Sequence, residues 1–411
     1  MKQRKLGTTG QIVCAMILAV AVGTVAGDRV APVKVVGDIF FHLIQMPIIL
    51  LVMGQLIEAV AGFNPREMGS VGGETIFIFL SSSLTAAVLG SMVGIWLKPG
   101  AAIKIAAVSA QTADASALQV KSFSETILGF FSKNIIESMA NGVIIQVILF
   151  AVLFGLAVSY VRVEKGKNEL YEVIKQFNAA IMRLMGMIMK VAPIGIFALM
   201  ASTIGSLGSK VILPLINYLL IYGGCTVAFF CLWLIVLSIS FKIPIWLLFK
   251  KISRISLMAL ATTSSAVTLP TTLKDSRERL GIGDRVAKLV LPLGMSINCN
   301  GAAMHMAITA VTITQIYGIT FGLNGYIYIV IMATMLSMAN AIVPGASVVS
   351  LAMIVPQLGL PVESIAIFAG LDWFVGMYRT ILNVDADVFT ALLVARSENE
   401  LDYNTFYSRE V

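Results

Sequence analysis

The chain has 411 residues, of which 58% are hydrophobic and 12% are charged, and its net charge is +7. Soluble domains carry about twice that charged fraction, so the composition predicts an all-α polytopic membrane protein, and apolar runs much longer than a barrel strand of about ten residues exclude a transmembrane barrel. The basic residues cluster between apolar runs, a pattern that orients membrane helices, so the positive charge does not indicate a nucleic-acid partner.

Apolar runs long enough to span a bilayer fill the first part of the chain. Six spans are predicted, at about 11–27, 36–63, 72–97, 126–161, 169–206 and 209–241. Basic residues mark alternate connections, at 2–5, 66, 162–167 and 242–254. Because cytoplasmic loops carry the excess of Lys and Arg, we expect a cytoplasmic N-terminus and a location in the cell membrane.

A polar interruption follows the sixth run. Residues 244–261 are moderately apolar, and the Thr- and Ser-rich stretch 262–270 interrupts them before a second basic cluster at 274–288. Basic residues at both ends of so short a segment indicate that both ends lie on the same side of the membrane. Non-helical backbone at membrane depth persists only inside protein or beside a cavity, so this segment is predicted to be a re-entrant helical hairpin.

A second hairpin is predicted after a span at about 289–316. Its arms are at about 326–340 and 350–359, and its tip is at 342–347. No Lys or Arg lies between 289 and 378, so this hairpin is expected to enter from the outside, opposite to the first. Each hairpin precedes a long apolar segment with a polar interruption: 289–316 is interrupted at 298–301, and 362–395 contains charged residues. This pairing indicates an inverted repeat with eight transmembrane helices in all.

A charged stripe lies within the last long apolar segment, 362–395. Asp372, Gly376, Arg379, Asn383 and Asp387 fall at i, i+4, i+7, i+11 and i+15, on one face of a helix. An Arg or Asp at the centre of a membrane helix costs about 2.5–3.5 kcal/mol on insertion scales, so these side chains are expected to face protein or a watery cavity. A structural Arg–Asp pair is one alternative. The stripe has more polar positions than one ion pair needs, which favours a transport site.

The same motifs carry the chemistry of anion binding coupled to a cation. Hairpin tips bring half-helix ends and backbone N–H groups near the midplane, which suits carboxylates, and Ser264 and Ser265 add hydroxyl donors. Arg379 can hold a carboxylate through two parallel hydrogen bonds. Asn298 and Asp387 offer oxygen ligands for an alkali cation. Each motif alone has an ordinary alternative: a back-bonded serine, a turn or a helix kink.

These motifs resemble those of the dicarboxylate/amino acid:cation symporter family, the glutamate transporter homologues. The similarity rests on four segments in the same order, 264–270, 292–301, 343–346 and 372–387. It implies a homotrimer in membrane lipid, in which a mobile "elevator" unit carries the substrate past a fixed scaffold. The implied division of the single membrane domain 1–411 is a scaffold at about 11–63 and 98–206, a transport unit at about 72–97 and 209–395, and a short polar cytoplasmic tail at 396–411, for which no function is expected.

The resemblance also implies the residues of each site. The substrate-binding residues would come from both hairpins and the eighth helix: Ser264, Ser265, Val343, Pro344, Gly345, Ala346, Gly376, Arg379, Thr380 and Asn383. One sodium site is matched in full by Gly294, Asn298, Asn383 and Asp387. A second, built largely from backbone carbonyls, would use Ser296, Ser337, Met338 and Asn340. A third retains Ser82 and Ser83 but is weakened, because its aspartate is Asn300 and its aromatic hydroxyl is Phe79.

Gly376 separates this chain from the family's amino-acid transporters. They carry an Asp at that position, one turn before the arginine, and it resembles the natural partner of a substrate ammonium group. Glycine supplies no counter-ion, so a buried ammonium there would cost roughly several kcal/mol. Ala302, where the family has Thr, removes another polar contact. We therefore expect a C4-dicarboxylate coupled to sodium; glutamate or aspartate is the alternative substrate, and a proton the alternative coupling ion.

Two other functional classes are alternatives to a symporter. An anion channel would share this architecture. An intramembrane enzyme would need a metal or a pair of nucleophile and base. Ser264 or Ser265 with His305 could be imagined as such a pair, but it is disfavoured because no partner of His305 is specified and a lone His is often held by ordinary hydrogen bonds. The four cysteines lie in apolar runs without metal-ligand spacing, and no carboxylate cluster would hold a divalent metal, so no enzymatic cofactor is expected.

Overall fold

The computed structural model describes residues 8–62, 65–101, 128–166, 169–208, 212–339 and 346–408. Every named element in these ranges is a helix, and the only β-type pairing there is an isolated antiparallel bridge between Ile282 and Leu401. The prediction of an all-α protein is therefore confirmed.

The helices of the two halves are as follows. The first half contains α1 (Thr8–Ala26), the 3₁₀ helix η1 (Gly27–Val33), α2 (Lys34–Ala61), α3 (Pro65–Leu97), α5 (Ile135–Ala140), α6 (Ile144–Lys165), α7 (Glu169–Ile188), α8 (Ala192–Leu207) and α9 (Ile212–Phe241). The second contains α10 (Ile245–Thr262), α11 (Ser265–Glu278), α12 (Asp284–Ile297), α13 (Asn300–Ile316), α14 (Leu323–Ser337), α15 (Ala346–Gln357), α16 (Ser364–Ala369), α17 (Asp372–Ser397) and α18 (Tyr403–Tyr407).

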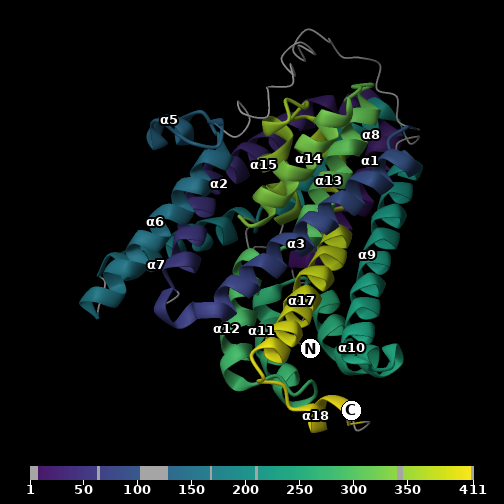
Figure 1. Cartoon of the computed structure of the whole chain (residues 1–411). Coiled ribbons are helices and arrows are strands. Elements are labelled where there is room, and N and C mark those ends of the chain that lie inside the picture. Colours follow the sequence, from purple (N-terminus) through teal and green to yellow (C-terminus); the bar gives the residue numbers. More distant parts are fainter. Residues whose placement is uncertain are drawn as a thin grey trace, which may run out of the picture.

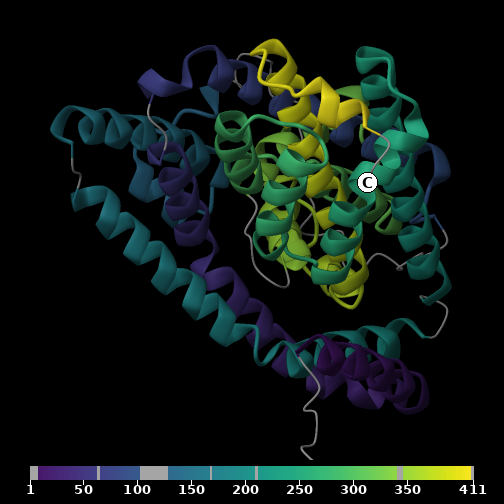
Figure 2. The same ribbon diagram turned by 90° about the horizontal axis from the view of Figure 1, so that it is seen from below.

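The helices form an outer band beside a compact bundle. α2 packs against α6, α7 and α8, and α8 packs against α1; Figure 2 shows these helices as a band along two sides of the green and yellow second half. α3 instead packs on α13, α14 and α17 (Figure 1), so it joins the bundle although it comes early in the sequence. α17 lies among α9, α10, α12, α13 and α15, which bury it on most sides.

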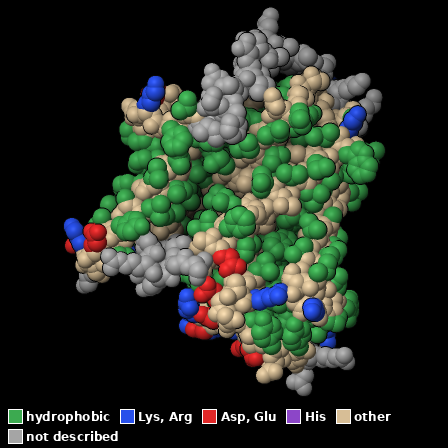
Figure 3. Space-filling view, viewed as in Figure 1, with side chains coloured by type: hydrophobic (Ala, Val, Ile, Leu, Met, Phe, Trp, Pro, Cys, Tyr) green, Lys and Arg blue, Asp and Glu red, His purple; other side chains and the backbone are tan. Residues whose placement is uncertain are grey.

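Apolar surface covers the middle of the face in Figure 3, and charged side chains gather at its lower end. Among the described residues, four helical stretches are long and apolar enough to cross a membrane: Cys14–Ala61, Val71–Leu97, Ile144–Lys165 and Ile212–Phe241. The pair α7 and α8 passes the same test only as one broken span, bent by 54°. The protein is thus a multi-pass membrane protein, in which several of the predicted spans are not single straight helices.

Three predicted spans differ from the structure in identifiable ways. The run predicted at 126–161 is interrupted, because Asn134 caps the short helix α5 and Gly142, at φ +69°, follows its end before α6 begins. The run predicted at 169–206 breaks before α8, where Pro193 occupies the first turn, a position that tolerates its missing N–H. The run predicted at 362–395 is divided into α16 and α17.

The predicted hairpin segments are observed as pairs of packed helices. α10 and α11 pack together and are joined by Thr263 and Ser264, inside the predicted interruption, with Thr263 in the left-handed region at φ +50°. α14 and α15 also pack together, but their connection, with most of the predicted tip, lies outside the described residues. The break predicted inside 289–316 is present, since α12 ends at Ile297 and α13 begins at Asn300.

The polar tail predicted at 396–411 packs on the rest of the protein in its described part. α17 continues to Ser397, and the following residues fold back onto the bundle, with Leu401 7% exposed and Phe406 fully buried. Two isolated apolar residues give no helical or strand periodicity, so the sequence did not reveal this contact.

Candidate functional site

The polar stripe predicted within 362–395 lies on the single helix α17 and is buried. The side chains of Asp372, Arg379, Asn383 and Asp387 are 9%, 6%, 6% and 3% exposed. The helices packed around α17 therefore screen the stripe from lipid, as the cost of polar groups in a bilayer requires.

Asp387 meets the break between α12 and α13. The Asn298 amide Nδ2 donates to Asp387 Oδ1 at 2.8 Å, and both residues are buried. A Cβ built on Gly294 would lie 2.3 Å from the same oxygen and 3.0 Å from Cζ of Phe79, so α12 approaches the carboxylate too closely for any side chain there. Three of the four residues in the first implied sodium set are thus in contact.

The chemistry of this cluster suits a sodium ion. Asn298 Oδ1 is buried without a hydrogen-bond partner, and no Lys or Arg of the described chain forms an ion pair with Asp387. An unpartnered buried oxygen beside an unpaired carboxylate is a donor set that a hard cation would satisfy. Asn383, the fourth member, accepts from the Gly301 N–H at 2.8 Å, which ties its oxygen to the start of α13.

Gly294→Ala is expected to displace the Asp387 carboxylate, because the added methyl group cannot coexist with an oxygen 2.3 Å away. Overpacking of this kind costs about 1–3 kcal/mol. The thermal midpoint of the purified protein should fall, and any rise that NaCl produces relative to KCl should disappear. Gly224→Ala is the matched control, because a Cβ there meets no atom of the described chain within 4 Å. A Gly294→Ala protein with the parent's midpoint and sodium response would refute this packing.

The residues of the weakened third set also come together. Asn300 Oδ1 accepts from Ser83 Oγ at 2.7 Å and from Ser82 Oγ at 3.2 Å, while its Nδ2 has no hydrogen-bond partner among the described residues. Phe79, one turn earlier on α3, is 2% exposed and adjoins Gly294. The arrangement contains hydroxyl and amide groups but no carboxylate, so its affinity for a cation is expected to be low.

The second implied set has no hydrogen bond between its helices in the described chain. Ser296 Oγ donates to the Pro292 carbonyl at 3.1 Å and Ser337 Oγ to the Thr334 carbonyl at 2.7 Å, so both hydroxyls are used within their own helices. Met338 follows Ser337 at the end of α14, and Asn340 lies outside the described residues. Any contribution from this set would come from backbone carbonyls, as expected from the sequence.

The Arg379 guanidinium is buried and forms no ion pair within the described part of the chain. Its Nη1 has no hydrogen-bond partner, and no carboxylate of the described chain lies within ion-pair distance of it. A buried, unpaired guanidinium is costly, and an incoming carboxylate could offset that cost with two hydrogen bonds.

Gly376 leaves room beside the tip of the first hairpin. Within the described chain, the only atom within 4 Å of a Cβ built there is the Cβ of Thr263, at 4.0 Å. Ser264 caps α11, accepting from the Val267 N–H at 3.4 Å, and Ser265 is the first residue of that helix. Thr380 is less available than expected, since its hydroxyl donates to the Gly376 carbonyl at 2.7 Å.

Asp372 has a role that the sequence did not indicate. Its Oδ1 accepts from the N–H groups of Ser347, at 3.1 Å, and Val348, at 3.3 Å, and so caps the start of α15. These two amides are engaged within the protein rather than free for a substrate. Ala346, the first residue of α15, is buried, and Val343, Pro344 and Gly345 lie outside the described residues.

Asp385 was missed because it is off the stripe. It is 1% exposed and accepts from Ser256 Oγ on α10 at 2.9 and 3.0 Å. Residues two apart point to different sides of a helix, so Asp385 faces α10 while Asp387 faces the α12–α13 break. A second Asp in an apolar helix was the available signal.

His305 is buried against α9 rather than near the hairpin serines. Its ring lies 5.7 Å from that of Tyr222, whose hydroxyl donates to the Gly301 carbonyl at 3.0 Å. No hydrogen bond joins His305 to Ser264 or Ser265 in the described chain, so the geometry does not support a nucleophile–base pair.

Comparison with known proteins identifies relatives along the whole chain. Residues 9–397 match the sodium:dicarboxylate symporter family. The proton/glutamate-aspartate symporter of Escherichia coli is 30% identical, with 100% of this chain and 98% of that protein covered. The proton/sodium-glutamate symport protein of Bacillus subtilis is 31% identical, with 97% and 94% covered. The C4-dicarboxylate transport protein of Rhizobium etli is 30% identical, with 95% and 89% covered.

Proposed function

Because the chain belongs to the sodium:dicarboxylate symporter family, we propose that it is a sodium-coupled symporter of a C4-dicarboxylate. The family resemblance predicted from the motifs is confirmed, and membership makes the chain a transporter rather than an enzyme. Family and relatives support cation-coupled transport of dicarboxylates or of glutamate and aspartate. The choice between these substrates, and the choice of sodium over a proton, are the proposal.

Gly376 is the observation that carries the substrate assignment. Space beside it faces Thr263, and no acid occupies the position one turn before Arg379. The next acid on this face, Asp372, already accepts two amides of α15. A substrate ammonium group would therefore lose its hydration without gaining a free carboxylate, whereas a plain dicarboxylate needs only Arg379 and neutral donors.

Sodium coupling is proposed from the Asp387 cluster. The Asp387 carboxylate lies against Gly294 and Asn298, and the buried Asn298 Oδ1 has no hydrogen-bond partner in the described chain. Together these oxygens form a set of hard ligands for a cation. A proton on Asp387 is the alternative, in which case the dependence of binding on pH would replace the dependence on sodium.

The transport cycle is proposed to follow the elevator scheme in a homotrimer. α1, α2 and α6–α8 would form the scaffold, and α3 with α9–α17 would form the moving unit, with both termini in the cytoplasm. The separation between the outer band and the inner bundle (Figure 2) supports this division. The two packed helix pairs, α10–α11 and α14–α15, would be the re-entrant hairpins.

Competition between succinate and aspartate tests the substrate assignment. Succinate should displace a labelled C4-dicarboxylate from the purified protein at lower concentration than aspartate, and NaCl should strengthen its binding relative to KCl. Gly376→Asp should reverse the order, because the new carboxylate attracts an ammonium and repels a substrate lacking one. The Cβ at Gly376 has room, so the variant should fold. Preferred aspartate binding by the unmodified protein would refute the assignment.

A further inference from the structure

The C-terminal residues 398–408, which we call the clasp, lie in a socket at the base of the first hairpin. Phe406 is fully buried, with its ring 5.2 Å from that of Phe241 at the end of α9. Leu401 is 7% exposed and bridges to Ile282 in the connection between α11 and α12. Burial of one aromatic and one aliphatic side chain removes apolar surface from water and so stabilises the docked position of the clasp.

Backbone hydrogen bonds fix the clasp on that connection. The Gly283 N–H donates to the Glu400 carbonyl at 2.7 Å, and the Asp402 N–H donates to the Gly281 carbonyl at 2.8 Å. Gly281 has φ +71°, and a Cβ there would lie 2.4 Å from the Asp402 carbonyl oxygen. The connection therefore needs glycine both for its conformation and for the close approach of the clasp.

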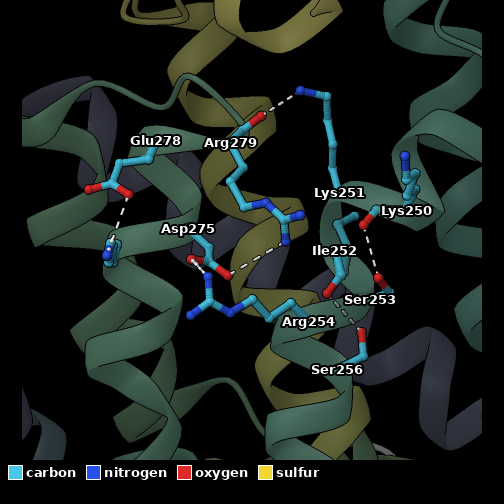
Figure 4. Close-up of polar contacts among 10 residues, drawn as sticks. Lys250, Lys251, Ile252, Ser253, Arg254, Ser256, Asp275, Glu278 and Arg279 are labelled. Atoms are coloured by element: carbon cyan, nitrogen blue, oxygen red, sulfur yellow. Dashed lines mark hydrogen bonds and ion pairs between the residues drawn. The ribbon is translucent and has the colours of Figure 1, made fainter. Parts of the chain in front are cut away.

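Lys251 joins the clasp to both arms of the hairpin. This fully buried residue of α10 donates from Nζ to the Arg279 carbonyl at 2.7 Å and to the Thr405 carbonyl at 2.9 Å. Arg279 is the C-cap of α11, where the negative end of the helix dipole favours a cation. Figure 4 shows Lys251 reaching Arg279 across the space between the arms.

A second tie between the arms lies one turn nearer the tip. Arg254 Nη1 of α10 lies 3.4 Å from Oδ1 of Asp275 on α11, and Asp275 is 1% exposed (Figure 4). This ion pair joins α10 to α11 directly, and no residue of the clasp takes part in it. Lys251 is thus the position at which α10, α11 and the clasp meet.

We propose that the clasp positions the first hairpin. By holding the two arms at their base, it fixes the tip, Thr263 to Ser265, against Gly376 on α17, where the tip and the stripe face each other. The inference rests on the proposed function in one respect: it gives the tip a part in dicarboxylate binding. Lys251 and Phe406 act through the hairpin and are positioning residues.

Hydrogen exchange of the full-length protein tests the positioning without any substrate. Lys251→Met keeps the aliphatic stem but removes the three-way contact, and Phe406→Ala empties the socket. In both, the backbone amides of Thr263, Val267 and Thr268, which are hydrogen-bonded in the folded hairpin, should exchange at least about tenfold faster, because local opening becomes easier. Exchange in α2 and α6 should be unchanged.

Tyr403→Ala is the matched control, because Tyr403 lies on the same short helix and is 47% exposed. It should leave exchange at the tip as in the parent. If Phe406→Ala does not fold, Phe406→Leu replaces it with a smaller loss of packing. Unchanged exchange at the tip in folded Lys251→Met and Phe406 variants would overturn the proposal, and so would acceleration spread evenly over the whole chain.

Dicarboxylate binding gives a second and separable readout. The clasp variants should need a several-fold higher succinate concentration for half-saturation, while the Tyr403→Ala protein matches the parent. If the parent itself binds no dicarboxylate, the proposed function fails, and faster exchange at the tip would still support positioning. Faster exchange with unchanged half-saturation would overturn the link between tip position and binding.

Discussion

Arg379→Ala is expected to abolish detectable dicarboxylate binding while leaving the protein folded. Removing one partner of a desolvated, hydrogen-bonded charge pair costs about 2–5 kcal/mol, so succinate affinity should fall at least about thirtyfold. Folding should not suffer, since the guanidinium is buried without a counter-ion in the described chain and its removal relieves that cost. Succinate titration followed by thermal shift, together with the midpoint of the ligand-free protein, measures both effects.

Arg379→Lys separates charge from geometry. Lysine keeps the positive charge but cannot form two parallel hydrogen bonds with one carboxylate, so most of the affinity should still be lost. Arg183→Ala is the control, because Arg183 is exposed on α7, far along the chain from the stripe. Parent-like succinate affinity in Arg379→Ala would remove Arg379 from the binding site.

Asp387→Asn is expected to raise the sodium concentration needed for half-maximal succinate binding by about tenfold or more. The substitution removes the one carboxylate in contact with Asn298 but keeps nearly the same volume, so packing against Gly294 is retained. Binding should be measured over a range of NaCl at constant ionic strength, and again across pH. Succinate binding that depends on pH and not on the sodium concentration would favour proton coupling.

The weakened third set provides a gain-of-function comparison. Asn300→Asp combined with Phe79→Tyr would return a carboxylate and a phenolic hydroxyl to the place where Ser82 and Ser83 already donate to residue 300. The sodium dependence of succinate binding should become steeper, as it does when another cation binds with the substrate. If this double variant and Asp387→Asn both titrate like the parent, the cation sites lie elsewhere.

Features with a high free-energy cost in a lipid bilayer could be predicted from the sequence. Arg379 and Asp387 in an apolar helix cost enough that burial in protein was the expected outcome, and α17 buries both. The interruption around Asn298 was equally clear, because consecutive polar residues and a glycine disrupt an apolar run.

Features that depend on distant partners were not predictable in this way. Asp385 is paired with Ser256, 129 residues earlier, and its place off the stripe becomes meaningful only once α10 packs there. Phe406 lies in a polar stretch, and only the fold supplies the ring of Phe241 that covers it. Local periodicity carries no information about either contact.

Two residues of chain separate Asn298, which bonds to Asp387, from Gly301, whose N–H bonds to Asn383. A shift of this short segment would change both hydrogen bonds, so it connects the proposed cation site at Asp387 with the proposed substrate-binding residue Asn383. Thermodynamic linkage then makes their influence reciprocal. If sodium tightens succinate tenfold, succinate must tighten sodium tenfold, a coupling free energy of about 1.4 kcal/mol. Asn383→Ala should reduce the effect of sodium on succinate affinity and the effect of succinate on sodium affinity by the same factor, even where the variant still binds both ligands.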